Sequence, residues 1–348
     1  MPVKTAEELH ATVRKILVGA GSDKENADRV ADGLVSANLS GVDPHGVFHV
    51  PEYVKDIRDG FIIPDAKSQI LNESPTTALV SGNWSFGFVT AKFALDLAIR
   101  KAKKNGISIV GIVQCTHIGR LGEYAEMAAA EGMVSFTWAG GYSEEQQSTV
   151  PFGGRGKILH TNPLSIGFPS GEESPMVMDF ATTVGSGSKI MVANEKGEQL
   201  PPGSIIDKNG NPSTNPADFL EGGAHLPFGG HKGYSIMLAV EFLGRIMTGS
   251  DDYAQSNRGG IYNRHQGITM MVHRADLFQP LEKFTKRSDE MECRLRAVPP
   301  APGFDEVLIP GDMEARTRKD RGRDGIPIPD HIWDSLLEVA SSLDVTIE

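Results

Sequence analysis

The chain has 348 residues, an apolar share of 39% and a formal net charge of −11. This length is enough for one large or two ordinary domains with a sizeable core. The negative charge argues against a nucleic acid or an anionic membrane surface as partner, because phosphate binding needs concentrated positive charge.

The cysteine content and the N-terminal residues indicate a reducing, cytoplasmic setting. Cys115 and Cys293 give neither a disulfide framework nor a metal-knuckle spacing. The N-terminal residues lack the apolar core of a signal peptide, and no run of about 18 apolar residues is present. We therefore expect no membrane span.

The opening residues have the pattern of a small helical layer. A capping box at Thr5 predicts the start of a first helix, and Ser22 is expected to cap a second one. A short third helix is predicted over Val47 to Ile57. We predict that residues 1–75 form a helical domain, joined by a C-terminal helix within residues 325–348.

Strands and helices then alternate, which is typical of an α/β arrangement. The period of the apolar residues predicts a strand at 78–82, a helix at 86–103, a strand at 107–113, a helix at 120–131 and a strand at 133–139. Further along, Asn209-Gly210 predicts a hairpin. A helix is expected at 232–247, a strand at 267–273, a proline-rich loop at 291–309 and a closing helix at 328–343. We assign residues 76–324 to one α/β domain.

The stretch from His160 to Lys189 links two apolar runs to a single carboxylate, Asp179. A carboxylate at the end of an apolar strand needs a partner, because burying an unpaired charge costs several kcal/mol. The small residues from Ala181 to Lys189 could cradle a diphosphate through their backbone N–H groups. A buried strand that runs into a flexible loop is an equal alternative.

Two histidines lie at junctions that favour chemistry. His45 follows a proline in GVDPHG, where its imidazole could exchange a proton near neutral pH. His117 lies between a predicted strand and a predicted helix, a position that often faces a ligand. A surface loop histidine and a helix-capping histidine are the respective alternatives. The histidines are scattered and no HExxH is present, so no metal site is expected.

The glycine-rich stretches match no common nucleotide-binding motif. Neither GxGxxG after a strand nor GxxxxGK[ST] is present, and no GxSxG supports a hydrolase. The segment PFGGHKG, at 227–233, suits either an anion at a helix start or simple helix entry.

A series of sequence blocks resembles the malate/L-lactate dehydrogenase family, the type without a Rossmann fold. The resemblance runs in the right order from about Leu34 to Pro329, and HIGRLG and LPFGGHKGY most resemble the hydroxycarboxylate dehydrogenase branch. The blocks are SGVDPHGVFHVPEYV, THIGRLGEYAEMAAAEGMVS, VPFGG, TNPLSIGFP, MDFATT, KGEQLPPG, DKNGNPSTNP, HKGYSIMLAVEFLGRIMTG, PGDMEARTR and GIPIP.

The resemblance implies an NAD(P)-dependent oxidoreductase that interconverts small 2-hydroxy and 2-oxo acids. It also implies an α/β (α+β) fold with a largely antiparallel sheet wrapped by helices, and a homodimer with its active site near the subunit boundary. The family's catalytic histidine matches His45, which would act as general acid and base. Asp179 matches an aspartate that orients a histidine or contacts the cofactor, and His117 matches a second histidine that some members use as the base.

The resemblance further implies the cofactor contacts, and NAD and NADP both remain open as the cofactor. These contacts would be made by Gly119, Arg120, Leu121, Met178, Asp179, Phe180, Ala181, Thr182, Gly229, Lys232, Glu314 and Arg316.

Two positions depart from the family pattern. Pro44 replaces a serine, and His49 stands where many members have an arginine that grips the substrate carboxylate. His49, Tyr53 or Arg120 would then bind the substrate, and we expect a bulkier or aromatic 2-oxo acid. The alternatives are a reductase of a cyclic imine carboxylate and a cofactor-binding protein without catalysis.

Overall fold

The computed structural model, which describes residues 1–141 and 146–347, is built around a seven-stranded sheet in the order β2-β3-β4-β11-β5-β6-β7. β3 and β4 run parallel, and the other neighbouring strands are antiparallel. This confirms the expected α/β fold with a largely antiparallel sheet and is unlike the parallel sheet of a Rossmann fold. The strands are β2 (Gln69–Glu73), β3 (Thr77–Ser81), β4 (Ile107–Val113), β5 (Met133–Gly140), β6 (Leu164–Phe168), β7 (Met176–Phe180) and β11 (Gly267–Arg274).

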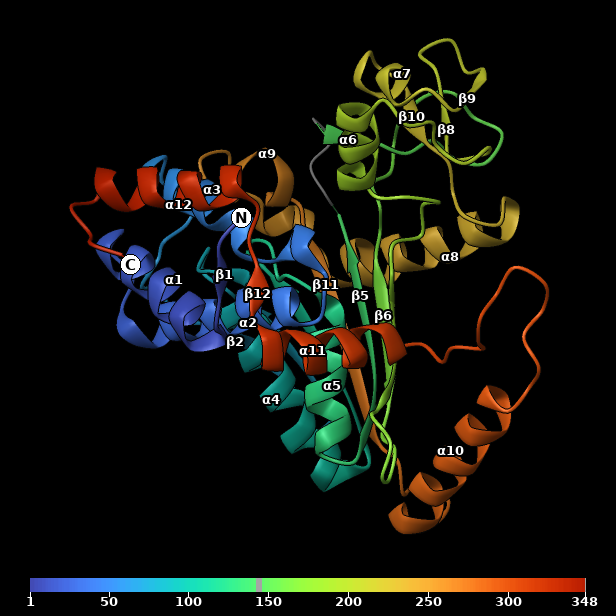
Figure 1. The fold of residues 1–348 in the computed structure, drawn as a ribbon. Coiled ribbons are helices and arrows are strands. Elements are labelled where there is room, and N and C mark those ends of the chain that lie inside the picture. Colours follow the sequence, from blue (N-terminus) through green and yellow to red (C-terminus); the bar gives the residue numbers. More distant parts are fainter. Residues whose placement is uncertain (142–145, 348) are drawn as a thin grey trace.

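Helices cover both faces of the sheet (Figure 1). α4 (Gly87–Asn105) and α5 (Leu121–Ala130) pack on one face, and α8 (His231–Glu241) continues as a π-helical turn, Phe242–Ile246, on the other. Side chains alternate along β11 accordingly, because successive residues of a strand point to opposite faces. Met270 is buried in the core that includes α4, whereas the hydroxyl of Thr269 donates to the carbonyl of Leu243 at 2.7 Å on the π-helical side.

The N-terminal helices and the C-terminal helix share a second core. α1 (Ala6–Gly19), α2 (Lys24–Leu39), α3 (Val50–Arg58) and α12 (Asp330–Ser342) meet there, and β1 (Val3–Lys4) pairs with β12 (Ile326–Pro327). Figure 1 shows these blue and red segments together on one side of the sheet. The capping box at Thr5 is confirmed. The prediction for Ser22 is wrong: Asp23 caps α2, and the Ser22 hydroxyl donates instead to the carbonyls of Asp23 and Pro64.

A small lobe, residues 186–226, lies at one end of the long central strands (Figure 1). It contains α6 (Gly187–Lys196), α7 (Pro216–Leu220) and a three-stranded sheet of β8 (Ile205–Ile206), β9 (Pro212–Ser213) and β10 (Ala224–His225). The hairpin predicted at Asn209-Gly210 is confirmed, because it joins β8 to β9.

The C-terminal third differs from the sequence prediction in two places. The expected loop at 291–309 is wrong over its first residues, because α10 (Leu281–Arg296) extends through them. α11 (Asp312–Asp324), which follows the loop, was not predicted. α9 (Gly260–Asn263) completes the helices of this region. None of the helices in the described part of the chain is both long and apolar enough to cross a membrane.

Candidate active site

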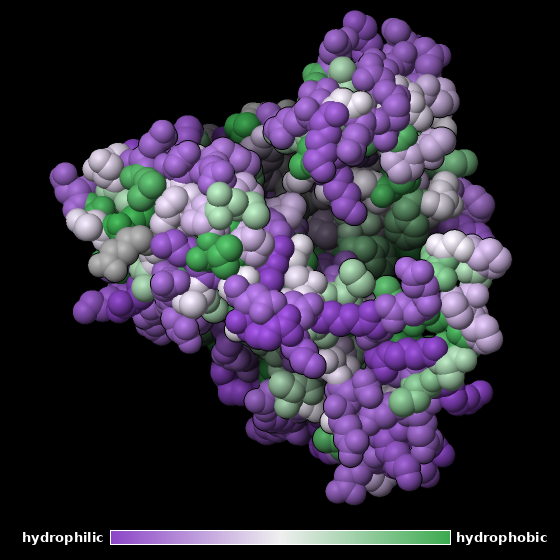
Figure 2. Space-filling view, in the orientation of Figure 1, coloured by the Kyte–Doolittle hydropathy of each residue, from purple (hydrophilic) through white to green (hydrophobic). Residues whose placement is uncertain are grey.

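A cavity of about 810 Å³ opens where the N-terminal helices, the sheet and the small lobe meet. Figure 2 shows the surface hollowed between these three parts and α11. Residues from 41 to 62 line its first wall, the segment before α5 and the end of β7 line its second, and residues 183–191 line its third. A cavity of this size is typical of a site for a small molecule or cofactor.

His45 is held at the cavity by a tight turn. The backbone N–H of Val47 donates to Asn38 Oδ1 at 2.9 Å, and Asn38 Nδ2 donates to Asp43 at 2.7 Å. A Cβ at Gly46 would lie 2.2 Å from Asn38 Oδ1, so only glycine fits this close approach. The turn therefore fixes the direction in which the His45 side chain points.

His45, His117 and Tyr53 form a hydrogen-bonded chain. His45 Nδ1 lies 3.2 Å from His117 Nε2, and the Tyr53 hydroxyl lies 2.7 Å from His117 Nδ1. Tyr53 comes from α3 and is 4% exposed, and His117 comes from the segment between β4 and α5. Both histidines line the cavity, so a ligand can reach the chain of hydrogen bonds at its His45 end.

Burial sets the protonation states of this chain. Burial, followed by the charges on His49 and Arg120, lowers the pKa of His45 to about 4. Burial likewise lowers the pKa of His117 well below its usual range and raises that of Tyr53. Both imidazoles are therefore neutral at pH 7, and the phenol keeps its proton. When the phenol donates to His117 Nδ1, His117 Nε2–H donates to His45 Nδ1, and the proton of His45 lies on Nε2.

His49 extends the cluster. Its Nδ1 lies 2.7 Å from Glu52 and its Nε2 lies 2.9 Å from the carbonyl of Pro44. The ring stacks on Tyr53 with an interplanar angle of 7°, and its centroid is 4.5 Å from that of His117. The sequence HGVFH, with two histidines four residues apart, was the one local signal that could have predicted this cluster.

Asp179 and Arg120 form a charged group on the wall made by the segment before α5 and the end of β7. Asp179 Oδ2 accepts a hydrogen bond of 2.7 Å from the backbone N–H of Gly122, in the first turn of α5. The Arg120 guanidinium is 4% exposed and pairs with Glu126 at 2.6 Å. Burial raises the pKa of Asp179 to about 6, although the Gly122 hydrogen bond and Arg120 oppose the rise.

Asp179→Asn is expected to stabilise the protein at high pH. Asparagine keeps an oxygen acceptor for Gly122 but carries no charge. The Asp179 carboxyl ionises near pH 4 when unfolded and near pH 6 when folded, so wild type loses stability relative to the variant as pH rises through this window. We expect an advantage of about 3 kcal/mol in free energy of unfolding at pH 8, disappearing below pH ~4. Urea unfolding of both proteins at each pH measures it, and an equal or less stable variant at pH 8 would contradict the expectation.

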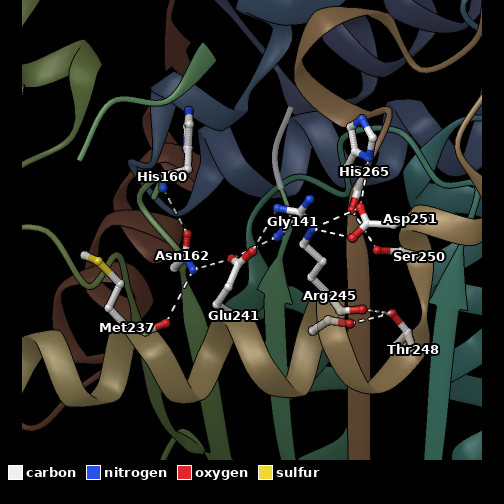
Figure 3. Close-up of polar contacts among 11 residues, drawn as sticks. Gly141, His160, Asn162, Met237, Glu241, Arg245, Thr248, Ser250, Asp251 and His265 are labelled. Carbon is white, nitrogen blue, oxygen red and sulfur yellow. Dashed lines mark hydrogen bonds and ion pairs between the residues drawn. The ribbon is translucent and has the colours of Figure 1, made fainter. Parts of the chain in front are cut away.

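A polar network braces a further wall, formed by the segment His160 to Pro163 (Figure 3). Asn162 is fully buried with a φ of 39°, and its Nδ2 donates to Glu241 at 2.8 Å. The same Glu241 oxygen accepts from the backbone N–H of Gly141 at 3.1 Å. Figure 3 shows the network continuing along the π-helical turn through Arg245, which pairs with Asp251 at 2.9 Å. α8 is thereby tied to the cavity wall.

The predicted site residues separate into three groups. Most of them line the cavity: His45, His49, Tyr53, His117, Gly119, Arg120, Leu121, Asp179, Phe180, Ala181 and Glu314. Met178 lines a neighbouring cavity of about 370 Å³, which shares Arg120, Asp179, Phe180 and Glu314 with the first. The rest lie elsewhere. Thr182 is buried and donates to the carbonyls of Thr161 and Asn162, Gly229 and Lys232 lie at the start of α8, and Arg316 pairs with Glu306.

Several residues in or next to the cavity were not predicted. Glu52 orients His49, and Glu126 pairs with both Arg120 and Arg318. Ser186 caps α6, so the loop expected to reach Lys189 ends in a helical first turn at Gly187. The combination of two glycines with a serine cap before an apolar run was a usable signal for a helix start. No local sequence pattern predicted the ion pairs of Glu52 and Glu126.

Comparison with known proteins gives one consistent result. A family model described as malate/L-lactate dehydrogenase matches residues 4–337. L-sulfolactate dehydrogenase of Methanocaldococcus jannaschii is 35% identical over 336 residues, which cover 96% of this chain and 95% of that protein. Hydroxycarboxylate dehydrogenase B of Escherichia coli is 32% identical over 351 residues, covering 99% and 95%.

Solved structures agree with these relatives. Sulfolactate dehydrogenase from Methanocaldococcus jannaschii superposes with a TM-score of 0.90 at 33% identity, covering 99% of this chain and 98% of that one. Delta1-piperideine-2-carboxylate reductase from Pseudomonas syringae superposes with a TM-score of 0.87 at 28% identity, covering 98% and 100%.

Proposed function

The chain belongs to the malate/L-lactate dehydrogenase family, and on this premise we propose that it is an NAD(P)-dependent oxidoreductase. It interconverts a 2-hydroxy acid and the corresponding 2-oxo acid by hydride transfer. The observation that carries the proposal is the hydrogen-bonded chain of Tyr53, His117 and His45, which ends at the cavity.

His45 is the general acid and base of the proposed reaction. For reduction, His45 takes up a second proton from solvent beside the anionic substrate, gives its Nε2 proton to the carbonyl oxygen of the 2-oxo acid and returns to the neutral ring. For oxidation, the neutral ring, with its own proton on Nδ1 beside His117, accepts the hydroxyl proton at Nε2 and releases it to solvent. His117 Nε2 holds the other ring nitrogen of His45 in place and shares the proton that arrives there. Tyr53 orients His117 from the buried side. We assign Tyr53 a positioning role, and its contact with the substrate stays a prediction from the sequence.

The residues around the cavity fit a dinucleotide cofactor. Arg120 Nε is buried and has no hydrogen-bond partner among the described residues. The segment Gly185 to Gly187 presents backbone at the cavity, where a Cβ on either glycine would meet nothing within 4 Å. Two helix starts, at α5 and α6, face the cavity, and helix N-termini favour phosphate groups. Bound NAD or NADP would supply or accept the hydride.

We assign the cofactor contacts to the walls that these features define. Gly119, Arg120 and Leu121 would hold it at α5, and residues 178–181 would hold it beside β7. Thr182, which is buried, stays a prediction from the family resemblance. Glu314 lines both cavities and would contact the distal end. Gly229, Lys232 and Arg316 stay a prediction from the family resemblance.

Two basic side chains beside His45 are the candidates to bind the carboxylate of the substrate. His49 and Arg120 are the basic side chains at this end of the cavity, and each lies against a carboxylate, Glu52 and Glu126 respectively. His49 is smaller than the arginine that many relatives carry at this position, so we retain the prediction of a bulkier or aromatic 2-oxo acid.

The function is tested by following NADH and NADPH oxidation against 2-oxo acids that range from pyruvate and oxaloacetate to aromatic members. We expect turnover, with an aromatic or branched acid preferred over oxaloacetate and pyruvate by at least about tenfold in kcat/KM, which corresponds to about 1.4 kcal/mol. Preference for oxaloacetate or pyruvate by a wide margin would contradict the substrate prediction. A cyclic imine carboxylate belongs in the same panel, because a reductase of such a compound is among the structural neighbours. If that compound is the best substrate, the imine reductase function replaces the dehydrogenase.

A cytoplasmic homodimer is part of the proposal. Phe242, Ile246 and Met247 form an exposed apolar stripe along the π-helical side and are 61%, 56% and 52% exposed. Exposed apolar groups of this kind mark association surfaces in many proteins. A monomeric mass by light scattering at micromolar concentration would exclude the dimer.

A further inference from the structure

We propose that His45, His49 and His117 form a binding site for a divalent transition-metal ion of the Zn²⁺ type. Ring nitrogens of the three side chains lie within 4.8 Å of one another. Metal binding here is a property separate from the proposed reaction, in which the histidines act without a metal. The metal-binding inference rests on the positions of the imidazoles alone.

The spacing of the imidazoles agrees with coordination of one ion. Zn–N bonds of about 2.0–2.1 Å in a tetrahedron place ligand nitrogens roughly 3.3–3.4 Å apart. His45 Nδ1 and His117 Nε2 are 3.2 Å apart. The centroids of His45 and His117 are 5.3 Å apart, and those of His49 lie 6.4 Å and 4.5 Å from them. Small side-chain rotations would therefore bring all three nitrogens onto one ion.

Two of the histidines have neighbours that can orient metal ligands, provided that His117 moves its proton from Nε2 to Nδ1 and donates it to the Tyr53 hydroxyl. Metal-bound histidines almost always donate their second ring N–H to a carboxylate or another oxygen. His49 Nδ1 faces the Glu52 carboxylate at 2.7 Å, and His117 Nδ1 faces the Tyr53 hydroxyl at 2.7 Å. Each arrangement leaves Nε2 as the ligand atom. To bind the ion, His49 Nε2 gives up its hydrogen bond to the carbonyl oxygen of Pro44.

The position of the cluster leaves a fourth coordination site for solvent or ligand. All three histidines line the 810 Å³ cavity, so an ion can enter and a water or an acid oxygen can complete a tetrahedron. Neutral imidazole favours Zn²⁺, Cu²⁺, Ni²⁺ or Co²⁺ over Mg²⁺ or Ca²⁺. A bound ion occupies the lone pairs through which His45 and His117 contact each other. It is therefore expected to inhibit the proposed dehydrogenase reversibly.

Direct metal titration of the full-length protein tests the site without any enzyme assay. Zn²⁺ is titrated in competition with a chromophoric chelator, and Co²⁺ is titrated while its visible absorption is recorded. We expect one ion per chain with the intense Co²⁺ bands of tetrahedral coordination. His49→Gln should weaken Zn²⁺ binding by about 100-fold or more, and Glu52→Gln by roughly 10- to 100-fold, as is usual for an outer partner of a ligand. His331→Gln, which changes an exposed histidine of α12, should bind as wild type does.

Three outcomes would overturn the proposal. In the first, His49→Gln and His45→Gln bind Zn²⁺ as tightly as wild type does. In the second, bound Co²⁺ shows only the weak bands of octahedral coordination. In the third, His331→Gln loses Zn²⁺ binding to the same extent as the cluster variants. Thermal unfolding of each variant without metal confirms that its fold is intact. The dehydrogenase proposal can fail in its own assay without affecting this result, because no cofactor or substrate is present in the titration.

Discussion

His45→Ala is expected to lower kcat by about 10²- to 10⁴-fold, the usual contribution of a positioned general acid or base. The side chain ends the hydrogen-bonded chain from Tyr53 and His117 and faces the cavity. Alanine removes the group that exchanges the proton with the substrate oxygen, and it leaves the α5 and β7 walls unchanged. Steady-state kinetics at saturating substrate and cofactor measure the loss.

Two further measurements make the His45 result specific. The dissociation constant of the cofactor, followed by fluorescence titration, should change by less than about threefold, because the cofactor contacts assigned to α5 and β7 do not include the imidazole. His117→Ala should lose less activity than His45→Ala, because His117 acts on the substrate through its neighbour. Unchanged turnover in His45→Ala would transfer the acid-base function to His117.

Glu123→Ala is expected to lower the free energy of unfolding by about 3–5 kcal/mol, the usual effect of breaking a buried ion pair. Arg29 of α2 donates to Glu123 of α5 at 2.8 Å, and the two side chains are 12% and 6% exposed. The guanidinium also lies 5.9 Å from the ring of Phe88 and 6.0 Å from that of Tyr124. Without Glu123 the charge of Arg29 stays buried among aromatic rings and loses its hydrogen-bonded carboxylate, which is why the effect is large.

Urea unfolding of Glu123→Ala measures the loss, with an exposed ion pair as the control. Lys55 and Asp59 pair at 2.6 Å with 70% and 41% of their side chains exposed, so Asp59→Ala should cost at most about 1 kcal/mol. Replacing both partners of the buried pair, as Arg29→Met with Glu123→Leu, should recover most of the stability. A cost below about 1 kcal/mol in Glu123→Ala would show that the pair contributes little.

The main elements of the fold were predictable because their apolar residues recur with a clear period. β4 agrees with its prediction residue for residue, and α5 and β11 agree within one residue at each end. The missed elements have no such pattern. β2 has four exposed residues among its five, and α11 buries none of its side chains. Salt bridges to other elements hold α11, including Arg321 to Asp43 of the His45 turn, and no local sequence pattern reveals such contacts.

The residues of the candidate site were easier to predict than their partners. His45, His117 and Asp179 lie at the cavity as the family resemblance implied. Their contacts cross long sequence separations, 72 residues for the two histidines and 57 for Asp179 and Gly122. Separations of this kind are fixed by packing between helices and sheet, which periodicity does not report. The orientation of Tyr53 toward His117 could not be derived for the same reason.

The two histidines are contributed by different parts of the molecule. His45 comes from the layer of N-terminal helices, whereas His117 follows β4 of the central sheet. Their 3.2 Å contact exists only while the helices are seated on the sheet. Catalytic activity would therefore depend on the packing of the N-terminal helices against the central sheet. As denaturant is added, activity should disappear before the helical content does, so a chain that retains most of its secondary structure can already be inactive.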